Sequence, residues 1–237
     1  YKKYNKQIID LDKKLKIEKE FSEFKGNELK KRQYLSGLSI EDLELILHPM
    51  AEEGKEASGS MGDDTPVAVL SSHFRPIGHY FRQNFSQVTN PPIDSLRENK
   101  VMSLKTRFGN LGNILDFDNL TEENIYVLDS PILTNSQFKS FKKVFFKKIK
   151  TIDCTFDINS SLKDRIEKIR SECEIAVREG SSTLILSDKN LSTSRASIPT
   201  ILAVGAVHSH LVKLGLRGYC SINVESSDAL DTHAFAV

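Results

Sequence analysis

The chain has 237 residues, of which 39% are hydrophobic and 27% charged, and its formal net charge is +1. This is the composition of a globular protein with room for one large domain. The balanced charge gives no reason to expect a nucleic acid or a membrane surface as a partner. The longest apolar stretch, residues 198–207, contains Pro199 and is too short to span a bilayer.

The start of the chain and its three cysteines indicate the cellular compartment. The first residues, YKKYNKQ, lack the apolar segment of a signal peptide, so we expect a cytoplasmic protein, or a plastid protein if the source is eukaryotic. Cys154, Cys173 and Cys220 are far apart in the sequence, and their spacing matches no zinc or iron–sulfur site. We interpret them as reduced thiols. Because the chain begins without Met and ends within a regular pattern, we interpret it as a piece of a longer protein.

Residues 1–33 are predicted to form a helical connecting segment. Ile8, Leu11 and Leu15 give a helical spacing with few apolar partners, and most other positions are Lys or Glu. We interpret these charges as a solvated face. A basic arm that binds nucleic acid is the alternative, but four glutamates dilute its charge.

Two short helices are expected next. Ser39 and Asp42 form a capping-box pattern, which predicts a helix over residues 40–47. Pro49 should end this helix. A second short helix is expected over residues 50–57.

Between residues 67 and 128 we predict one strand and two helices. Residues 67–70 are typical of a short buried strand, and a helix should begin at Pro76. Asp94 or Ser95 can cap a further helix that ends near residue 103. Residues 105–128 are rich in Gly, Asn and Asp, so we expect irregular structure there.

A helix beginning at Asn135 or Ser136 has Phe138, Phe141 and Phe145 on one side and five lysines elsewhere. The lysines could form a phosphate-binding patch. The segment has no arginines interleaved with aromatic residues, so an ordinary solvated face is the better interpretation.

From residue 150 the pattern is β-α-β-α-β-α. We predict strands over residues 151–156, 183–186 and 219–224, and a further helix near Ser227. Between the strands, helices are expected to run from Ser161 to Gly180 and from Pro199 to Gly215. The fold class is therefore α/β: a Rossmann-like three-layer domain with a largely parallel sheet, preceded by a helical N-terminal segment.

In a parallel sheet, ligands bind outside the carboxyl ends of the strands. Asp188 and Glu225 follow two predicted strands, which makes them candidates for a ligand site. The alternative, which the residues favour, is that both carboxylates cap helices or bond loop amides. The chain has no G-x-G-x-x-G and no P-loop motif. His208 and His210 are two apart on a helix, so they point in different directions and no metal site is predicted.

Two stretches are unusually rich in Gly, Asp, Asn and Pro. The first, residues 50–64, has acidic residues around several glycines, and contact with a neighbouring domain explains it better than contact with a substrate. The second, residues 87–94, reads QVTNPPID. Thr89 and Asn90 offer hydrogen bonds, and the two prolines hold the loop rigid. This loop could line a passage for a small neutral molecule, or it could simply separate two helices.

Together these motifs resemble the central domain of the large subunit of glutamate synthase. The matching segments include MAEEGKE, SMGDDTP and QVTNPPID, and the resemblance continues around residues 130–133, 184–188, 203–216 and 224–226. It covers roughly residues 34–237. We therefore divide the chain into a connecting segment, 1–33, and a central domain, 34–237, that is truncated at its C-terminal end.

The resemblance implies that this chain is part of a larger enzyme that makes glutamate. In this family a class II glutamine amidotransferase domain releases ammonia from glutamine. A barrel domain with FMN and a 3Fe-4S cluster then makes glutamate from 2-oxoglutarate, with electrons from a small subunit or from ferredoxin. The central domain joins the two and contributes to the ammonia tunnel.

By this resemblance, Thr89, Asn90 and Ile93 are the candidates for lining the tunnel. Residues that would contact neighbouring domains are Glu52, Lys55, Asp63 and Asp64. No catalytic residue, metal ligand or cofactor site is expected in this chain, and alone it should be inactive. The alternative is a free-standing Rossmann-like domain that binds a small molecule at Asp188 and Glu225.

Overall fold

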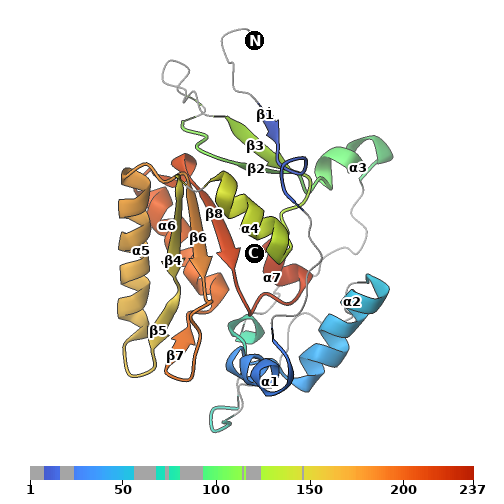
Figure 1. The fold of residues 1–237 in the computed structure, drawn as a ribbon, viewed down its shortest axis with the longest axis vertical. Coiled ribbons are helices and arrows are strands. Elements are labelled where there is room, and N and C mark those ends of the chain that lie inside the picture. The colour runs from blue at the N-terminus through green and yellow to red at the C-terminus, as the bar shows by residue number, and fades with distance from the viewer. Residues whose placement is uncertain are drawn as a thin grey trace.

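The computed structural model describes residues 8–16, 24–55, 68–72, 75–80, 93–113, 115, 124–145 and 147–237. It is an α/β structure with a parallel sheet in its C-terminal half and a second, mixed sheet nearby (Figure 1). None of the described helices is both long and apolar enough to cross a membrane.

The parallel sheet consists of three strands in the order β4 (Ile149–Asp153), β6 (Thr183–Ser187) and β8 (Ser221–Glu225). Both neighbouring pairs are parallel, which confirms the predicted strand direction. All five residues of the central strand β6 are buried, as expected for a strand with neighbours on both sides.

Two helices pack together against one face of this sheet: α5 (Leu162–Arg178) and α6 (Thr200–Lys213) (Figure 1). Alternate strand residues point into the core between them. The core includes Ile152, Leu184 and Leu186 from the strands and Ile169, Val207 and Leu211 from the helices. All three cysteines are buried in this same core, although they are far apart in the sequence.

The predicted ends of these helices are confirmed. Ser161 Oγ accepts a hydrogen bond from the Asp164 backbone N–H at the start of α5. Gly180 follows α5 with a φ of 94°, a conformation that favours glycine at a helix end. Pro199 directly precedes α6, as predicted. The predicted helix near Ser227 begins later, as α7 (Thr232–Ala236).

A second core lies under a smaller sheet. Here β3 (Ile125–Leu128) pairs in parallel with β1 (Ile8–Asp10) and antiparallel with β2 (Thr106–Phe108). Helix α4 (Asn135–Val144) contributes Phe141 to this core, 5.5 Å from Phe108 between ring centroids. The other buried members are Leu11, Leu15, Leu128 and Phe145.

This second sheet corrects two predictions. Residues 105–128 are not irregular throughout, because they contain β2 and β3. Residues 8–10 of the predicted helical segment 1–33 form a strand, while α1 (Gly26–Leu35) is helical and extends past residue 33. Strands of three or four residues are too short to show a clear period, so only their pairing partners identify them.

Short helices make up most of the described residues from 24 to 104. They are α1, the π-helical turn η1 (Asp42–Leu47), α2 (His48–Glu53), the 3₁₀ turn η2 (Ile77–Tyr80) and α3 (Ser95–Val101). The described residues in this range include no buried residue. This part of the chain therefore lies outside both hydrophobic cores.

The predicted caps in this region are confirmed, but two other predictions are wrong. Ser39 Oγ accepts from the Asp42 N–H at 3.0 Å, and the Asp42 carboxylate accepts from the Ser39 N–H at 2.8 Å. Asp94 caps α3. Pro49 does not end the helix, because it lies in the first turn of α2, where a missing N–H is tolerated. Residues 68–70, in the predicted buried strand, form an exposed turn instead.

A two-stranded ribbon extends from the carboxyl end of β4. It pairs β5 (Thr155–Asp157) antiparallel with β7 (Arg195–Ser197). The predicted single strand over 151–156 is thus divided at Cys154, and β7 was not predicted. A 3₁₀ turn, η3 (Arg217–Tyr219), precedes β8.

Candidate functional site

The three parallel strands place polar residues at one edge of the sheet. Asp153, Ser187 and Glu225 end their strands at the same register position. This is the edge at which parallel sheets bind ligands. The sequence prediction included Glu225 but missed Asp153, because the predicted strand continued past it to residue 156.

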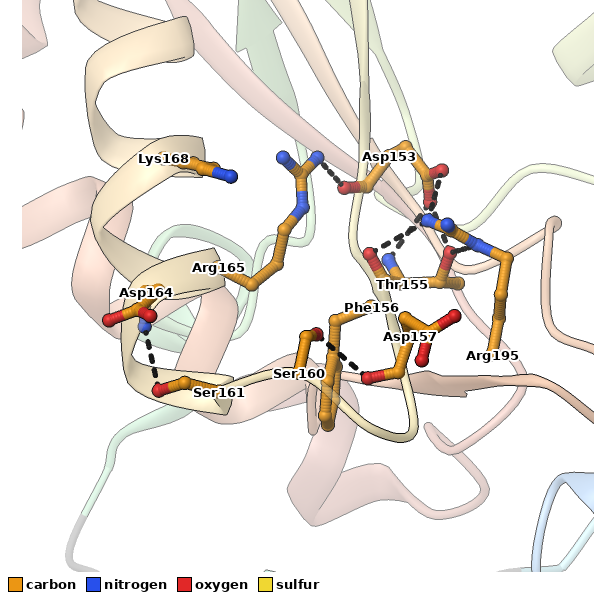
Figure 2. A pocket seen from close by; sticks show the side chains of 10 residues that line it. All are labelled: Asp153, Thr155, Phe156, Asp157, Ser160, Ser161, Asp164, Arg165, Lys168 and Arg195. Carbon is orange, nitrogen blue, oxygen red and sulfur yellow. Dashed lines mark hydrogen bonds and ion pairs between the residues drawn. The ribbon is translucent and has the colours of Figure 1, made fainter.

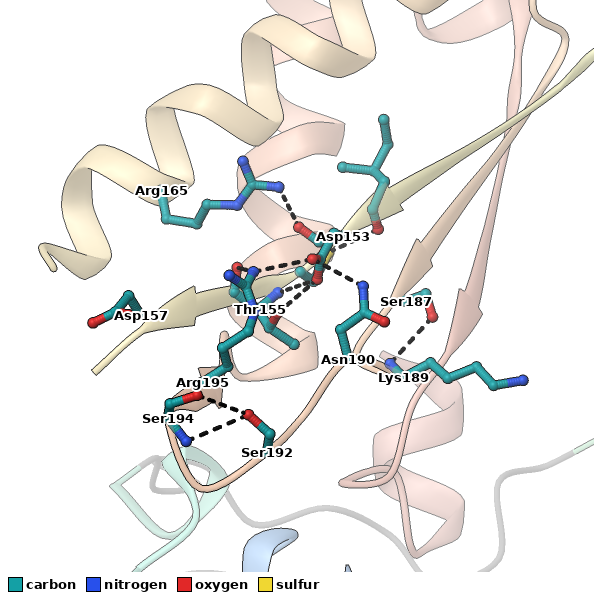
Figure 3. Close-up of polar contacts among 12 residues, drawn as sticks. Asp153, Thr155, Asp157, Arg165, Ser187, Lys189, Asn190, Ser192, Ser194 and Arg195 are labelled. Carbon is teal, nitrogen blue, oxygen red and sulfur yellow. Dashed lines mark hydrogen bonds and ion pairs between the residues drawn. The ribbon is translucent and has the colours of Figure 1, made fainter. Parts of the chain in front are cut away.

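Asp153 is the centre of a polar network (Figure 3). Its Oδ1 accepts hydrogen bonds from the Thr155 backbone N–H at 2.9 Å and the Thr155 hydroxyl at 2.7 Å. Its Oδ2 accepts from Asn190 Nδ2 and Arg195 Nη2, both at 3.0 Å. Burial raises the pKa of Asp153, but the hydrogen bonds from Asn190 and Thr155 and the charge of Arg195 outweigh it, so the pKa lies below its ordinary value. Asp153 is therefore ionised at neutral pH.

Two arginines are held beside this carboxylate. Arg195 Nε donates to the buried Thr155 hydroxyl at 2.8 Å, and its Nη2 also donates to the Thr155 carbonyl at 3.1 Å. Arg165 Nη1 donates to Glu172 Oε1 at 2.6 Å, and its Nη2 donates to the Asp153 carbonyl. Both guanidinium groups are thus fixed in place by protein acceptors.

A pocket of about 400 Å³ lies between the start of α5 and the β5–β7 ribbon (Figure 2). We call it the α5 pocket. Its lining residues are Asp153, Thr155, Phe156, Asp157, Ser160, Ser161, Asp164, Arg165, Lys168 and Arg195.

The lining of the α5 pocket is suited to binding rather than to nucleophilic catalysis. Its described lining residues include neither His nor Cys. Ser160 Oγ donates to the Asp157 carbonyl at 2.7 Å, and Ser161 Oγ caps α5. Both hydroxyls are thus used in local backbone structure, and no lining histidine is available to activate them.

The two predicted ligand residues, Asp188 and Glu225, lie outside the α5 pocket. Asp188 is buried, and its Oδ2 accepts from both the N–H and the hydroxyl of Ser227 at 2.7 Å. Burial raises the pKa of Asp188, although the Ser227 hydrogen bonds act in the opposite direction. Its contacts are those of a carboxylate that orders the loop after β8.

Glu225 connects the sheet to α4. It accepts from Ser187 Oγ at 2.9 Å and lies 3.3 Å from Lys142 Nζ. Lys142 also lies 4.4 Å from the centre of the Phe138 ring. Both predicted ligand carboxylates are therefore engaged by groups of the protein itself, and ligand binding at them stays a prediction.

Three of the predicted interface and tunnel residues are described. Glu52 lies 2.7 Å from His48, and Lys55 lies 2.8 Å from Glu53, with all four side chains exposed. Ile93 is half-buried directly before the cap of α3. The other predicted residues, Asp63, Asp64, Thr89 and Asn90, lie outside the described residues.

The described residues include potential metal ligands, the side chains of His, Cys, Asp and Glu. Where the structure describes side chains, no three His, Cys, Asp or Glu residues gather as potential ligands. Burial raises the pKa of both Cys154 and Cys173 to about 12 and also raises that of Cys220, so these thiols are protonated at neutral pH. The two helix histidines have separate partners: His210 lies 2.9 Å from Glu174, and His208 accepts from Arg217 at 3.2 Å.

The comparisons with known proteins identify the class to which this α/β domain belongs. The family model described as "Glutamate synthase central domain" matches residues 31–237. The chain is 52% identical over 233 residues to "Glutamate synthase [NADPH] large chain" of Azospirillum brasilense, which covers 97% of this chain and 15% of that protein. The chain therefore belongs to the glutamate synthase central-domain family.

Other relatives extend across bacteria and plants. The chain is 40% identical over 234 residues to "Glutamate synthase [NADPH] large chain" of Bacillus subtilis, covering 96% of this chain and 15% of the relative. It is 41% identical over 212 residues to "Ferredoxin-dependent glutamate synthase, chloroplastic" of Spinacia oleracea, covering 87% and 13% respectively. The chain thus spans 13–15% of the length of these relatives.

Proposed function

We propose that this chain is the central part of a glutamate synthase large subunit. In this role it joins a class II glutamine amidotransferase domain to an FMN-binding barrel domain of the same polypeptide. The complete enzyme would convert glutamine, 2-oxoglutarate and two electrons into two molecules of glutamate. The observation that carries the proposal is the family match over residues 31–237, together with the much greater length of the relatives.

The chemistry would take place elsewhere in the polypeptide. The described part of this chain offers no set of metal ligands, and the α5 pocket contains no histidine or thiol. We therefore assign FMN and the 3Fe-4S cluster to other domains and propose that this chain alone is inactive. The proposed electron donor is a small subunit or ferredoxin, because the relatives include proteins named for NADPH, at 52% and 40% identity, and a protein named for ferredoxin, at 41% identity.

Within this role, we assign Thr89, Asn90 and Ile93 to the wall of an ammonia passage. Ammonia released into water would be protonated and diluted, whereas an enclosed passage keeps it reactive and concentrated. Glu52, Lys55, Asp63 and Asp64 would contact the neighbouring domains. The exposure of Glu52 and Lys55 supports this assignment, because both side chains remain accessible to a partner.

The location would follow that of the relatives. Those from bacteria are named without a compartment, whereas several plant relatives are named as chloroplastic. We propose the cytoplasm for a bacterial source and the plastid for a plant source.

The test uses the intact gene product with Asn90→Leu, which replaces a polar side chain by an apolar one of similar size. Glutamine hydrolysis and glutamate formation from 2-oxoglutarate are measured together. We expect hydrolysis to continue while free ammonia accumulates and glutamate formation falls. Lys163→Ala changes an exposed residue of α5 and serves as the control. In this variant the amount of glutamate formed per glutamine hydrolysed should equal that of the wild type. Tight coupling in Asn90→Leu would contradict the tunnel assignment.

The domain arrangement has its own test. Mass spectrometry of the natural gene product should give a chain several times longer than 237 residues. A natural product of this length would overturn the proposed role as a central domain.

A further inference from the structure

We infer that the α5 pocket binds a small zwitterion that carries one carboxylate and one ammonium group, namely a free α-amino acid. This goes beyond the proposed function, which places no ligand in this part of the chain. The inference depends on the position of the pocket, on how its charges are paired, and on which charges remain.

The position and size of the α5 pocket suit a small ligand. Its volume of about 400 Å³ lies within the range of small-molecule sites. Asp153 brings it to the carboxyl end of β4, the usual location of ligands in parallel sheets. Its walls come from α5, from β5 and from β7, so three separate elements define its shape (Figure 2).

The two arginines shape the pocket without giving it a net charge. Arg195 is paired with Asp153 at 3.0 Å, and Arg165 is paired with Glu172 at 2.6 Å. Each guanidinium also donates to a backbone carbonyl. Because each arginine has its own carboxylate, neither adds an unbalanced positive charge for a ligand to neutralise.

Asp164 forms no ion pair among the described residues, but its negative charge lies at the start of α5. It lies in the first turn of α5, whose Ncap residue is Ser161. A carboxylate in this position is stabilised by the partial positive charge of the helix N-terminus. The 17-residue length of α5 makes this a full-sized helix rather than an isolated turn.

Apart from Asp164 at the helix start, one lysine and one aspartate of the lining remain without an ion-pair partner among the described residues. Lys168 lies on the α5 wall and Asp157 on the β5 wall, and Figure 2 shows them on opposite sides of the α5 pocket. Within the described part of the chain, neither takes part in an ion pair, with the other or with any third side chain. Among the described residues, the Asp157 carboxylate accepts one hydrogen bond, from the backbone N–H of Asn159 at 2.8 Å.

A free amino acid complements this arrangement. Its carboxylate can face Lys168 while its ammonium group faces Asp157, so both unpaired charges gain a partner and no net charge enters the pocket. The half-buried ring of Phe156 offers an apolar contact for the rest of the ligand. A phosphate would be repelled by Asp157 and Asp164, and a simple amine would leave Lys168 unpaired.

The experiment measures binding to the intact gene product by isothermal titration calorimetry. The probes are a panel of the common L-amino acids, with sodium acetate and methylammonium chloride as the two half-ligands. We expect at least one amino acid to bind, and both half-ligands to bind about tenfold more weakly or worse. Failure of every amino acid to bind overturns the inference, and so does acetate or methylammonium binding equally tightly.

Variants assign the binding to this pocket rather than to an active site elsewhere in the polypeptide. Lys168→Ala and Asp157→Asn should each weaken binding about tenfold, because each removes one charge-assisted contact. Lys163→Ala is the matched control, since Lys163 is an exposed lysine of α5 that does not line the pocket. Unchanged affinity in Lys168→Ala, or an equal loss in Lys163→Ala, would refute the assignment.

Thermal unfolding of each variant checks that the fold is retained. Lys168→Arg keeps the positive charge, so its affinity should be much closer to that of the wild type than the affinity of Lys168→Ala. The binding measurement requires no turnover. It can therefore fail while the tunnel experiment succeeds, and the two proposals are tested separately.

Discussion

Replacing Asp153 with alanine removes the acceptor on which four side-chain and backbone donors converge at the end of β4. Hydrogen bonds of this kind contribute roughly 1 kcal/mol each, or about 4 kcal/mol for the set. The side chains of Asp153 and Arg195 are 31% and 38% exposed, so solvent screening reduces the expected loss of stability to about 2–3 kcal/mol. Most of this loss comes from the buried Thr155 hydroxyl, which loses its acceptor, because Arg195 keeps the Thr155 hydroxyl and carbonyl and the exposed Asn190 can bond to water.

The same carboxylate predicts a pH dependence. The pKa of Asp153 is lower in the folded chain than its ordinary value, so folding favours the ionised form. A group of this kind stabilises the fold above its unfolded pKa, and that stabilisation is lost as the pH falls through the folded pKa. The difference in unfolding free energy between the wild type and Asp153→Ala should therefore be largest near neutral pH and shrink below about pH 4.

Urea unfolding of the 237-residue chain, followed by circular dichroism from pH 3 to 7, measures both effects. Glu167→Ala is the control, because Glu167 is an exposed acidic residue of α5. It should change the unfolding free energy by less than about 0.5 kcal/mol at any pH. An Asp153→Ala loss below about 1 kcal/mol at neutral pH, or one that grows towards acid pH, would refute the role of Asp153 as the centre of the network.

Two further predictions concern glycines and thiols. A Cβ at Gly218 would lie 2.8 Å from the carbonyl oxygen of Gly112, so Gly218→Ala should lower the melting temperature. Gly205→Ala should raise it, because Gly205 lies within α6 with nothing near its Cβ position and alanine is the better helix former by about 1 kcal/mol. Cys154 and Cys173 should resist iodoacetamide at pH 8 until the chain is unfolded in urea, because burial raises both pKa values to about 12. Rapid labelling of the folded chain, read by mass spectrometry, would show that this core opens readily.

Long helices and the central strand could be predicted from the sequence because their patterns repeat. Helix α5 shows its apolar stripe over 17 residues, and its cap and closing glycine are local signals. Strand β6 is apolar because it is covered on both faces and paired on both edges. The order of these elements then implied a parallel sheet with polar residues at the carboxyl ends of its strands.

The three-residue strands could not be predicted in this way. β1, β2 and β7 are each only three residues long, so they show too little alternation to be recognised. They become strands because partners distant in the sequence supply their hydrogen bonds. The turn at residues 68–70 shows the opposite case, because these residues of the predicted strand are exposed, with Leu70 at 98%.

The sequence by itself determined the family, through motifs such as QVTNPPID, and the α/β class, through the alternation of helix and strand patterns. Only the tertiary structure decided the site. The division of the predicted strand at Cys154 and the pairing of β5 with β7 bring Arg195 to Asp153, 42 positions away. The α5 pocket depends on that pairing, because its walls come from segments that no local pattern connects. Spacing along a chain specifies which residues share one helix or strand, whereas contacts between elements depend on how those elements pack.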